Sequence, residues 1–287
     1  MILPGTQSPT LADGRLARWL FPTPSPQARF QQMLERGEFE PAGIFVSMSD
    51  NETLNGALVT SDLGGLQVDI GPTHTENNEI AEALLQAAVT AWQARGIKQF
   101  QCLVKPSESN RVLARVGFRN VTSLNFYERD ITAADADLLP PRLQLREVID
   151  DEQSFADLLL NTFVDSLDVP ELNGTRTAME TLAGYKTGST VDPPIWFFVT
   201  LDGNDVGVLI LNPHSPTNFE LTYMGLVPSA RRQGHGRELA GIAVALTASF
   251  GGTRLHLSAD ARNSSADRVY SQLGFHVVEQ RAVWLLI

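Results

Sequence analysis

Residues 226–241, LVPSARRQGHGRELAG, combine glycines and cations in a way that is typical of an anion-binding turn. Gly234 and Gly236 would let a ligand approach the backbone with no Cβ in the way. A helical pattern follows, and the first N–H groups of a helix lack partners within the helix and carry partial positive charge. Local positive charge comes from three arginines, Arg231, Arg232 and Arg237. The stretch therefore predicts a phosphate-binding site at a helix N-terminus.

Two common phosphate-binding motifs do not fit this stretch. A P-loop would need Gly-Lys-Ser/Thr, and the dinucleotide fingerprint G-x-G-x-x-G would need a third glycine three residues after Gly236, where the chain has Leu239. On these residues alone, an ordinary basic turn at the start of a helix remains the alternative.

The composition of the 287-residue chain excludes several functional classes of protein. A net charge of −11 argues against nonspecific binding to nucleic acid or to an anionic membrane. The single cysteine, Cys102, excludes an internal disulfide and a four-cysteine zinc site, and its apolar neighbours predict a buried strand residue. No apolar run approaches about 18 residues, and no signal peptide is evident. We expect a cytoplasmic enzyme or binding protein without a metal.

The elements that must position the turn occur in both halves of the chain. RVLARVGF at residues 111–118 is similar to RVYSQLGF at residues 268–275, which lies 157 residues later. The acidic stretch at residues 131–142 ends in Pro-Pro-Arg and is a candidate linker. Helices mixed with hairpin strands favour a duplicated α+β fold over a doubly wound sheet. We therefore expect domains at residues 1–138 and 139–287.

The second half has the clearer pattern of strands and helices. Residues 151–166 predict a helix, and residues 194–212 predict a hairpin around an Asp-Gly turn. The later elements are expected as a strand at 219–227, a helix at 236–250, a strand at 253–260 and a helix at 264–273. The glycine-rich turn thus connects a strand to a helix.

The motifs of this half closely resemble those of the GNAT superfamily of acyl-CoA-dependent N-acyltransferases. Residues 231–236, Arg-x-x-Gly-x-Gly, fit the family's pyrophosphate loop, (Gln/Arg)-x-x-Gly-x-(Gly/Ala). Asn263, Tyr270 and the Gly-Phe pair that follows fit its Asn…Tyr-x-x-x-Gly-Phe pattern. The resemblance is strong over residues 205–287 and weak in the first half of the chain. It implies two tandem GNAT-like domains, the first of them degenerate.

The resemblance implies an acetyl-CoA site, or a site for another acyl-CoA, in the second domain. Backbone amides of the loop would bind the pyrophosphate. The preceding strand would diverge from its neighbour, and its free backbone groups would pair with the pantetheine arm. The amide near Leu226 would stabilise the thioester oxyanion. The implied cofactor-binding residues are Gly225, Leu226, Val227, Arg232, Gln233, Gly234, His235, Gly236, Arg237 and Asn263.

For catalysis, the resemblance implies that Tyr270 is the general acid that protonates the leaving thiolate, with core packing as the alternative. Glu220 is the candidate base that deprotonates the acceptor amine, which has a pKa of about 10. An exposed strand carboxylate is the alternative for Glu220. Some family members place a base at the position of Ser258, which is a poor base, so Glu220 or a chain of water molecules would serve.

Other polar residues leave alternatives open. Asp168 and Glu171 lie in a segment that shapes the acceptor pocket in GNAT enzymes, where these carboxylates would attract a cationic amine. A solvated loop is the alternative. The side chain of His235 would face either phosphate or solvent, and His256 would be a core or lining residue.

The first half lacks the counterparts of these residues. Residues 72–82, PTHTENNEIAE, contain no Arg-x-x-Gly-x-Gly and place acidic residues where a phosphate would lie. At the 157-residue offset, Leu113 takes the place of Tyr270. We expect this domain to have no CoA site. It would instead form one wall of the acceptor pocket or support the catalytic second domain.

The combined prediction is an N-acetyltransferase that transfers an acyl group from acyl-CoA to an amine by direct attack in a ternary complex. The acceptor would be a small molecule or a peptide. A non-catalytic acyl-CoA-binding or regulatory protein is an alternative from another class. A tandem enzyme that builds a small thiol or an antibiotic adduct is a third possibility.

Overall fold

The structure is a computed structural model, and it describes residues 2–4, 14–21, 23–35, 40–51, 53–71, 73–75, 77–105, 110–136, 142–189, 191 and 194–287. The chain divides into two compact units, Met1–Asn120 with Val283–Ile287, and Val121–Ala282. The predicted boundary between residues 138 and 139 lies outside the described residues. Residues 121–136 nevertheless belong to the second unit, because residues 124–130 pair with one of its strands.

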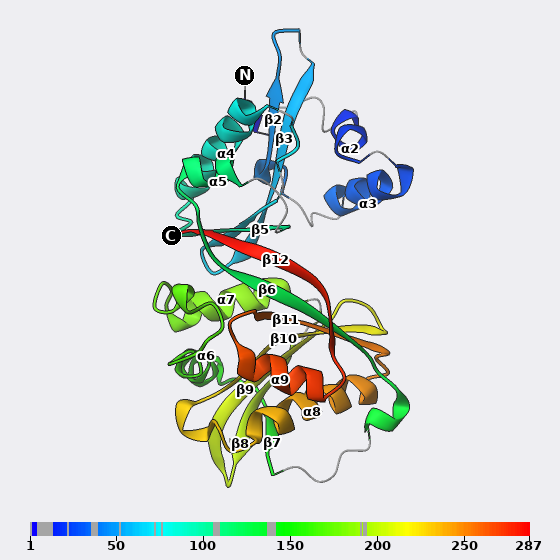
Figure 1. Ribbon diagram of the computed structural model, residues 1–287, viewed down its shortest axis with the longest axis vertical. Coiled ribbons are helices and arrows are strands. Elements are labelled where there is room, and N and C mark those ends of the chain that lie inside the picture. The colour runs from blue at the N-terminus through cyan, green and yellow to red at the C-terminus, as the bar shows by residue number, and fades with distance from the viewer. Residues whose placement is uncertain are drawn as a thin grey trace. The chain divides into compact units, whose positions relative to one another are not determined.

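The first unit is a sheet with helices on both faces (Figure 1). Leu16, Leu20 and Phe30 of the first two helices pack on Ile44 and Val46 of the sheet. The long helix α4 lies on the opposite side of β2 and β3 (Figure 1). The elements are β1 (Ile2–Pro4), α2 (Arg15–Leu20), α3 (Pro24–Glu35), η2 (Pro41–Gly43), β2 (Ile44–Met48), β3 (Leu54–Gly64), β4 (Gln67–Ile70), α4 (Asn78–Gln93), β5 (Gln99–Val104) and α5 (Arg111–Val116).

The strands of this unit run in the order β1-β2-β3-β4-β5, and the end of the last strand of the chain follows β5. Strands β4 and β5 are parallel and stay paired from Gln67 with Gln99 to Asp69 with Gln101. Cys102 is buried in β5, as predicted.

The second unit has the following elements: β6 (Arg119–Asp130), η3 (Ala133–Ala136), β7 (Gln144–Glu147), α6 (Glu152–Asn161), η4 (Pro170–Leu172), α7 (Ala178–Gly188), β8 (Ile195–Leu201), β9 (Asn204–Pro213), β10 (Asn218–Leu226), η5 (Pro228–Ala230), α8 (His235–Ser249), β11 (Arg254–Asp260), α9 (Ser264–Gln272) and β12 (His276–Leu286). Strands β6 and β12 each begin or end in the first unit. The predicted Asp-Gly hairpin is confirmed, because Asp202 and Gly203 join β8 to β9 with φ values of 51° and 79°.

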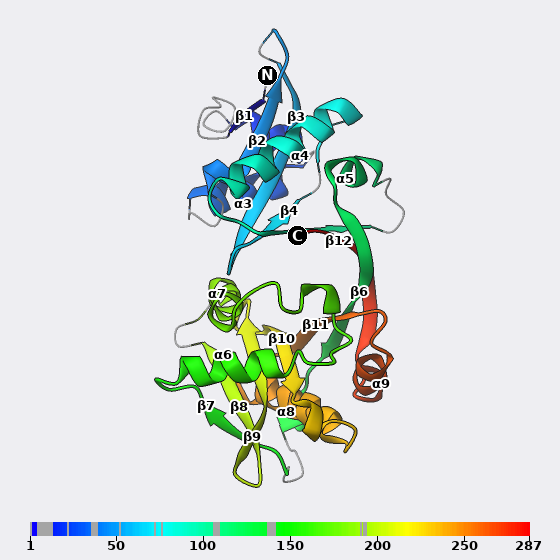
Figure 2. The ribbon, with the colours of Figure 1, turned by 90° about the vertical axis from the view of Figure 1, so that its left-hand side faces the viewer.

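The sheet of the second unit has the order β12-β6-β11-β10-β9-β8-β7. Strands β10 and β11 are parallel, whereas the pairs β6–β11, β9–β10, β8–β9 and β7–β8 are antiparallel. Side chains of β9 alternate between two cores, with Leu209 and Leu211 in the core that includes α8, and Val208 and Ile210 in the core that includes α6. Figure 2 shows α6 and α7 close together over the sheet. The predicted α+β class is confirmed.

The internal repeat is visible in the backbone. Gly117 after α5 and Gly274 after α9 are 157 residues apart, and both have positive φ, 102° and 84°. In each case the next residue donates its N–H at 3.0 Å to the carbonyl five positions earlier. Helices α4 and α8 also begin 157 residues apart, at Asn78 and His235. The same turn chemistry therefore recurs at the same offset.

Helix α6 ends earlier than the sequence predicted, at Asn161 rather than near residue 166. The guanidinium of Arg231 donates hydrogen bonds to the carbonyls of Thr162, at 2.8 Å, and Val164, at 2.7 Å. The hydrogen bonds of these carbonyls are therefore made by Arg231 and not by a further turn of α6. Asp165 then has a φ of 53°, which is incompatible with a right-handed helix, so α6 cannot continue to residue 166.

Candidate functional site

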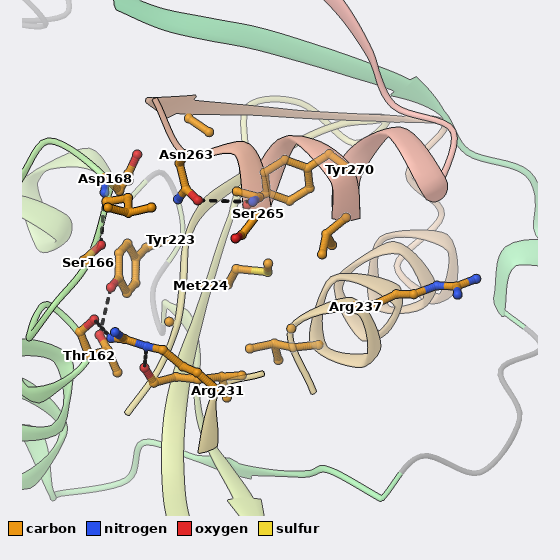
Figure 3. Close-up of a pocket in the computed structure, with 18 of the residues that line it drawn as sticks. Thr162, Ser166, Asp168, Tyr223, Met224, Arg231, Arg237, Asn263, Ser265 and Tyr270 are labelled. Atoms are coloured by element: carbon orange, nitrogen blue, oxygen red, sulfur yellow. Dashed lines mark hydrogen bonds between the residues drawn. The ribbon is translucent and has the colours of Figure 1, made fainter. Parts of the chain in front are cut away.

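A cavity of about 720 Å³ opens in the second unit beside β10 (Figure 3). Its walls come from β10, β11, the start of α8, helix α9 and the loop after α6. It brings together most of the predicted site residues, namely Asp168, Gly225, Leu226, Arg232, Gly234, Gly236, Arg237, Asn263 and Tyr270. Residues that the sequence placed on separate elements therefore share one surface.

The loop before α8 presents a row of backbone donors. Arg232 and Gly234 have positive φ values of 61° and 87°, which turn the chain into the helix. No described residue accepts a hydrogen bond from the N–H groups of residues 232–236, and Gly234 caps the helix without a side-chain hydrogen bond. A Cβ built at Gly234 or Gly236 would meet no atom within 4 Å. Both observations fit the close approach of an anion.

Strands β10 and β11 separate before the loop that leads to α8. This confirms the prediction that the strand before the loop diverges from its neighbour. Their pairing extends only from Asn218 to Glu220, although β11 continues to pair with β6 as far as Asp260. On the other edge of β10, Val227 N–H donates to Val206 at 2.9 Å. Because donors alternate along a strand, the N–H of Leu226 points to the edge that β11 has left.

Gly225 is required by packing between side chains. A Cβ at this position would lie 2.6 Å from Thr162 Oγ1 and 2.5 Å from the hydroxyl of Tyr223. These two groups are themselves hydrogen bonded at 2.8 Å. A β-bulge lies nearby at Thr222, where the register of β10 with β9 shifts.

Arg231, the first residue of the motif, is bound to protein rather than free for a phosphate. Its guanidinium donates to three backbone carbonyls, including that of Leu226 at 2.9 Å (Figure 3). It therefore ties the end of β10 to the end of α6. Arg237 points away from the other labelled residues (Figure 3), and both Arg232 and Arg237 are exposed.

Tyr270 of α9 and Asn263, which precedes this helix, lie at the other wall of the cavity (Figure 3). Tyr270 is buried, and its ring contacts Tyr127 and Phe275 with centroids 5.5 and 5.8 Å apart. Burial, followed by the charge of Asp168, raises the pKa of Tyr270, so the hydroxyl keeps its proton at neutral pH. Asn263 caps α9, and its Oδ1 accepts the N–H of Ala266 at 3.2 Å.

Three residues assigned to cofactor binding do not line the cavity. Val227 is buried in the core, and the amide of Gln233 donates to the carbonyl of Ser229 at 2.9 Å. The side chain of His235 is 2% exposed, with Nδ1 3.5 Å from Arg142. The expectation that the side chain of His235 faces phosphate or solvent is therefore wrong, because it packs beneath the loop.

Glu220 lies outside the cavity lining, on β10 before the bulge. Its Oε2 is 2.7 Å from Nε2 of His214, and this contact raises the pKa of His214. His256, on the neighbouring strand, is half-buried with Nδ1 3.4 Å from Glu128. Ser258 does line the cavity.

Asp168 and Glu171 belong to one ionic network centred on the buried Asp260. Asp168 Oδ1 accepts the N–H of Asp260 at 2.8 Å, and an oxygen of Asp260 accepts the N–H of Val169 at 3.1 Å. Arg262 binds both oxygens of Glu171, at 2.7 and 2.9 Å, and also binds Asp260. Glu171 is thus already paired, whereas Asp168 reaches the cavity.

Asp260→Asn is expected to reduce the free energy of unfolding of the second unit by about 1.5–3 kcal/mol at pH 7, because Arg262, Thr122 and Val169 lose hydrogen bonds to a charged carboxylate. Burial alone would raise the pKa of Asp260, but hydrogen bonds from Arg262, Thr122 and Val169 hold it below its usual value. This stabilisation is therefore present above the unfolded pKa of about 3.9 and is lost as pH falls toward the folded pKa.

Urea unfolding of wild type and Asp260→Asn at pH 7 and below about pH 4 measures this effect. The two proteins should converge in acid. Glu152→Gln, which removes an exposed ion pair with Lys186, is the control and should cost less than about 1 kcal/mol. Equal free energies of unfolding for wild type and Asp260→Asn at pH 7 would contradict a stabilising role for the network around Asp260.

The equivalent turn of the first unit is closed to an anion. At the 157-residue offset Asn77 replaces Gly234, and its side chain accepts the N–H groups of Glu79, at 2.8 Å, and Ile80, at 3.3 Å. Glu79 replaces Gly236 and brings a negative charge to the first turn of α4. The donors that α8 leaves open are therefore used within α4.

Sequence reasoning missed Thr162, Tyr223 and Thr222, which line the cavity. The glycine at 225 within a strand was the one available signal, since it indicates close approach of another group. Its partner Thr162 is 61 residues from Tyr223, and no local pattern links them.

Residues 161–275 match the model of the Acetyltransferase (GNAT) family. The second unit thus contains a GNAT acetyltransferase domain, as the motifs predicted. A search of curated proteins found no match.

Solved structures show the same fold over the whole chain. A GCN5-related N-acetyltransferase from Sphaerobacter thermophilus has a TM-score of 0.65 and 14% identity, over 100% of this chain and 95% of its own. A tandem GNAT protein from the clavulanic acid biosynthesis pathway has a TM-score of 0.54 and 14% identity, over 100% and 97%. A putative acetyltransferase from Pyrococcus horikoshii has a TM-score of 0.54 and 12% identity, over 100% and 88%. The tandem GNAT fold is confirmed.

Two negative findings concern the described part of the chain. It contains no cluster of three or more His, Cys, Asp or Glu side chains suited to a metal ion. None of its helices combines the length and apolarity needed to cross a membrane.

Proposed function

We propose that this protein transfers an acetyl group from acetyl-CoA to the nitrogen of a small-molecule or peptide amine, by direct attack in a ternary complex. One observation carries the proposal. The row of open N–H groups at residues 232–236 lies on the same cavity as the free edge of β10 and the buried Tyr270.

The cavity suits the two parts of CoA differently. The N–H row and the exposed Arg232 and Arg237 would bind the pyrophosphate, in a protein whose net charge is −11. The edge of β10 that faces the gap would pair with the amides of the pantetheine arm, as an added strand would.

The same edge would serve the reaction. The N–H of Leu226 would donate to the thioester oxygen as it becomes an oxyanion. Tyr270, which stays protonated at neutral pH, would give its proton to the departing sulfur. Among the predicted bases, Glu220 would have to act from outside the cavity, since its carboxylate pairs with His214.

The proposal is tested by measuring thiol release from acetyl-CoA across a panel of amines, with CoA binding followed by calorimetry. We expect CoA to bind and at least one amine to release thiol with formation of its N-acetyl product. Binding without turnover on every amine would instead indicate a regulatory acyl-CoA-binding protein.

A calorimetric titration should also find one CoA per chain, because Asn77 occupies the donors of the first unit's turn. Asn77→Ala and Glu79→Gln should leave CoA affinity unchanged within about twofold, which corresponds to roughly 0.4 kcal/mol. A second equivalent of CoA, or a large effect of either substitution, would contradict a degenerate first domain.

A further inference from the structure

Asp168 occupies a position that the reaction, as described so far, does not use. It lines the same cavity as Gly225, Tyr223 and Tyr270. Figure 3 shows it on the side of Tyr223 and Thr162, across the cavity from Arg237. The carboxylate is therefore placed on the acceptor side rather than at the proposed pyrophosphate site.

The loop holds Asp168 in one orientation. Its N–H donates to Ser166 Oγ at 3.1 Å, and its Oδ1 accepts the N–H of Asp260 at 2.8 Å. The flanking Asp165 and Val169 have φ values of 53° and 42°, which are unfavourable for a β-branched residue such as Val169. The other carboxylate oxygen, Oδ2, accepts no hydrogen bond from any described residue.

Among the described residues that line this side of the cavity, no cation is free to pair with this oxygen. Arg231 donates to three backbone carbonyls, and Arg262 is held by Glu171 and Asp260. Among the described residues that line the cavity, the remaining cations are Arg232 of the turn before α8 and Arg237 of the first turn of α8. A free carboxylate oxygen without a protein counter-ion attracts a cationic ligand.

The groups that face Asp168 come from four elements. They are Asp260 of β11 and the neighbouring Arg262, together with Tyr185 of α7, Tyr223 of β10 and Tyr270 of α9. Burial raises the pKa of Asp168, and the charge of Asp260 adds to this, whereas the Asp260 N–H and Arg262 act in the opposite direction. A carboxylate with a raised pKa is a better proton acceptor.

We propose that Asp168 binds the ammonium form of the acceptor and takes its proton, and that the acceptor carries no carboxylate beside this amine. The inference rests on the proposed acetyl transfer. An α-amino acid would bring its own carboxylate close to Asp168, and no arginine that lines this side of the cavity is free to receive it. A simple primary amine avoids this repulsion.

The proton balance is as follows for an acceptor R–NH₃⁺. One proton passes to Asp168 and then to solvent, and the neutral nitrogen attacks the thioester carbon. The N–C bond forms and the C–S bond breaks. The second nitrogen proton replaces the one that Tyr270 gives to sulfur. The products are the N-acetylamine, CoA thiol and one proton.

Asp168→Asn tests the inference, because it keeps the shape and the acceptor for Asp260 N–H while removing the charge. With phenethylamine as probe, kcat/KM should fall by about 10²-fold or more at pH 7. The deficit should narrow as pH approaches the amine pKa of about 10, where neutral amine is abundant. CoA affinity should stay within about threefold, equivalent to roughly 0.6 kcal/mol. Phenylalanine should be a much poorer substrate than phenethylamine.

Two further variants keep the result decisive. Asp157→Asn makes the same change on the exposed face of α6 and should behave as wild type. Asp168→Glu retains the charge and should recover part of the activity if Asp168→Asn folds poorly. A loss in Glu220→Gln with none in Asp168→Asn would overturn the inference and restore Glu220 as the base.

Binding of phenethylamine in the presence of CoA, followed by calorimetry, separates this inference from the proposed function. A weaker Kd in Asp168→Asn supports the ammonium site even if turnover is absent. Full activity and an unchanged Kd in Asp168→Asn overturn the inference and leave acetyl transfer intact. An absence of both binding and turnover with every amine overturns both.

Discussion

Tyr270→Phe should lower kcat by about 10²–10⁴-fold, which is the usual contribution of a general acid. The substitution keeps the ring, and therefore the contacts with Tyr127 and Phe275, but removes the proton that would reach the leaving sulfur. CoA binding should weaken by no more than one hydrogen bond, about 0.5–1.5 kcal/mol, or up to roughly tenfold in Kd. Steady-state kinetics and calorimetry on the same preparation measure the two effects.

Tyr127→Phe is the matched control for this prediction. Tyr127 is also buried and lies beside Tyr270, but its hydroxyl donates to Asp267 at 2.8 Å and does not line the cavity. Its removal should leave kcat within about threefold, equivalent to roughly 0.6 kcal/mol. A loss in Tyr270→Phe that is confined to CoA affinity would mean that the hydroxyl holds the ligand and that another group protonates the thiolate.

Gly236→Leu should weaken CoA binding by about 10²–10⁴-fold without unfolding the protein. A Cβ at Gly236 meets no protein atom within 4 Å, so a side chain would instead fill the space above the N–H row. If this space holds the pyrophosphate, the bulky group blocks about two hydrogen bonds to charge, each worth about 1.5–3 kcal/mol. Calorimetry gives the affinity, and thermal unfolding reports on the fold.

Gly234→Leu and Gly251→Leu form a matched pair for the same site. Both glycines have positive φ, 87° and 81°, and a Cβ at either position would meet nothing within 4 Å. Each substitution therefore carries a similar backbone cost of about 1–2 kcal/mol. Only Gly234 lies at the start of α8, so only Gly234→Leu should lose CoA. Equal CoA affinity in the two variants would refute the pyrophosphate assignment.

The local features of the site could be predicted from the sequence. The helix that starts beside Gly234, the strand before it and the repeat at 157 residues all depend on short-range patterns, namely apolar periodicity, turn glycines and capping residues. The predicted absence of a CoA site from the first unit follows the same logic. Asn77 and Glu79 stand where the second unit has glycine, and a capping side chain uses the donors that a phosphate would need.

The faces and partners of the site residues were decided only by the tertiary structure. A bulge at Thr222 shifts the register of β10 after Leu221, and no sequence pattern marks it, so the position of Glu220 outside the cavity could not be foreseen. Arg231 binds carbonyls 67 and 69 residues away, and Asp168 binds Asp260 at a separation of 92. Such contacts form only after the sheet has brought distant segments together, because a hydrogen bond depends on distance and direction and not on order along the chain.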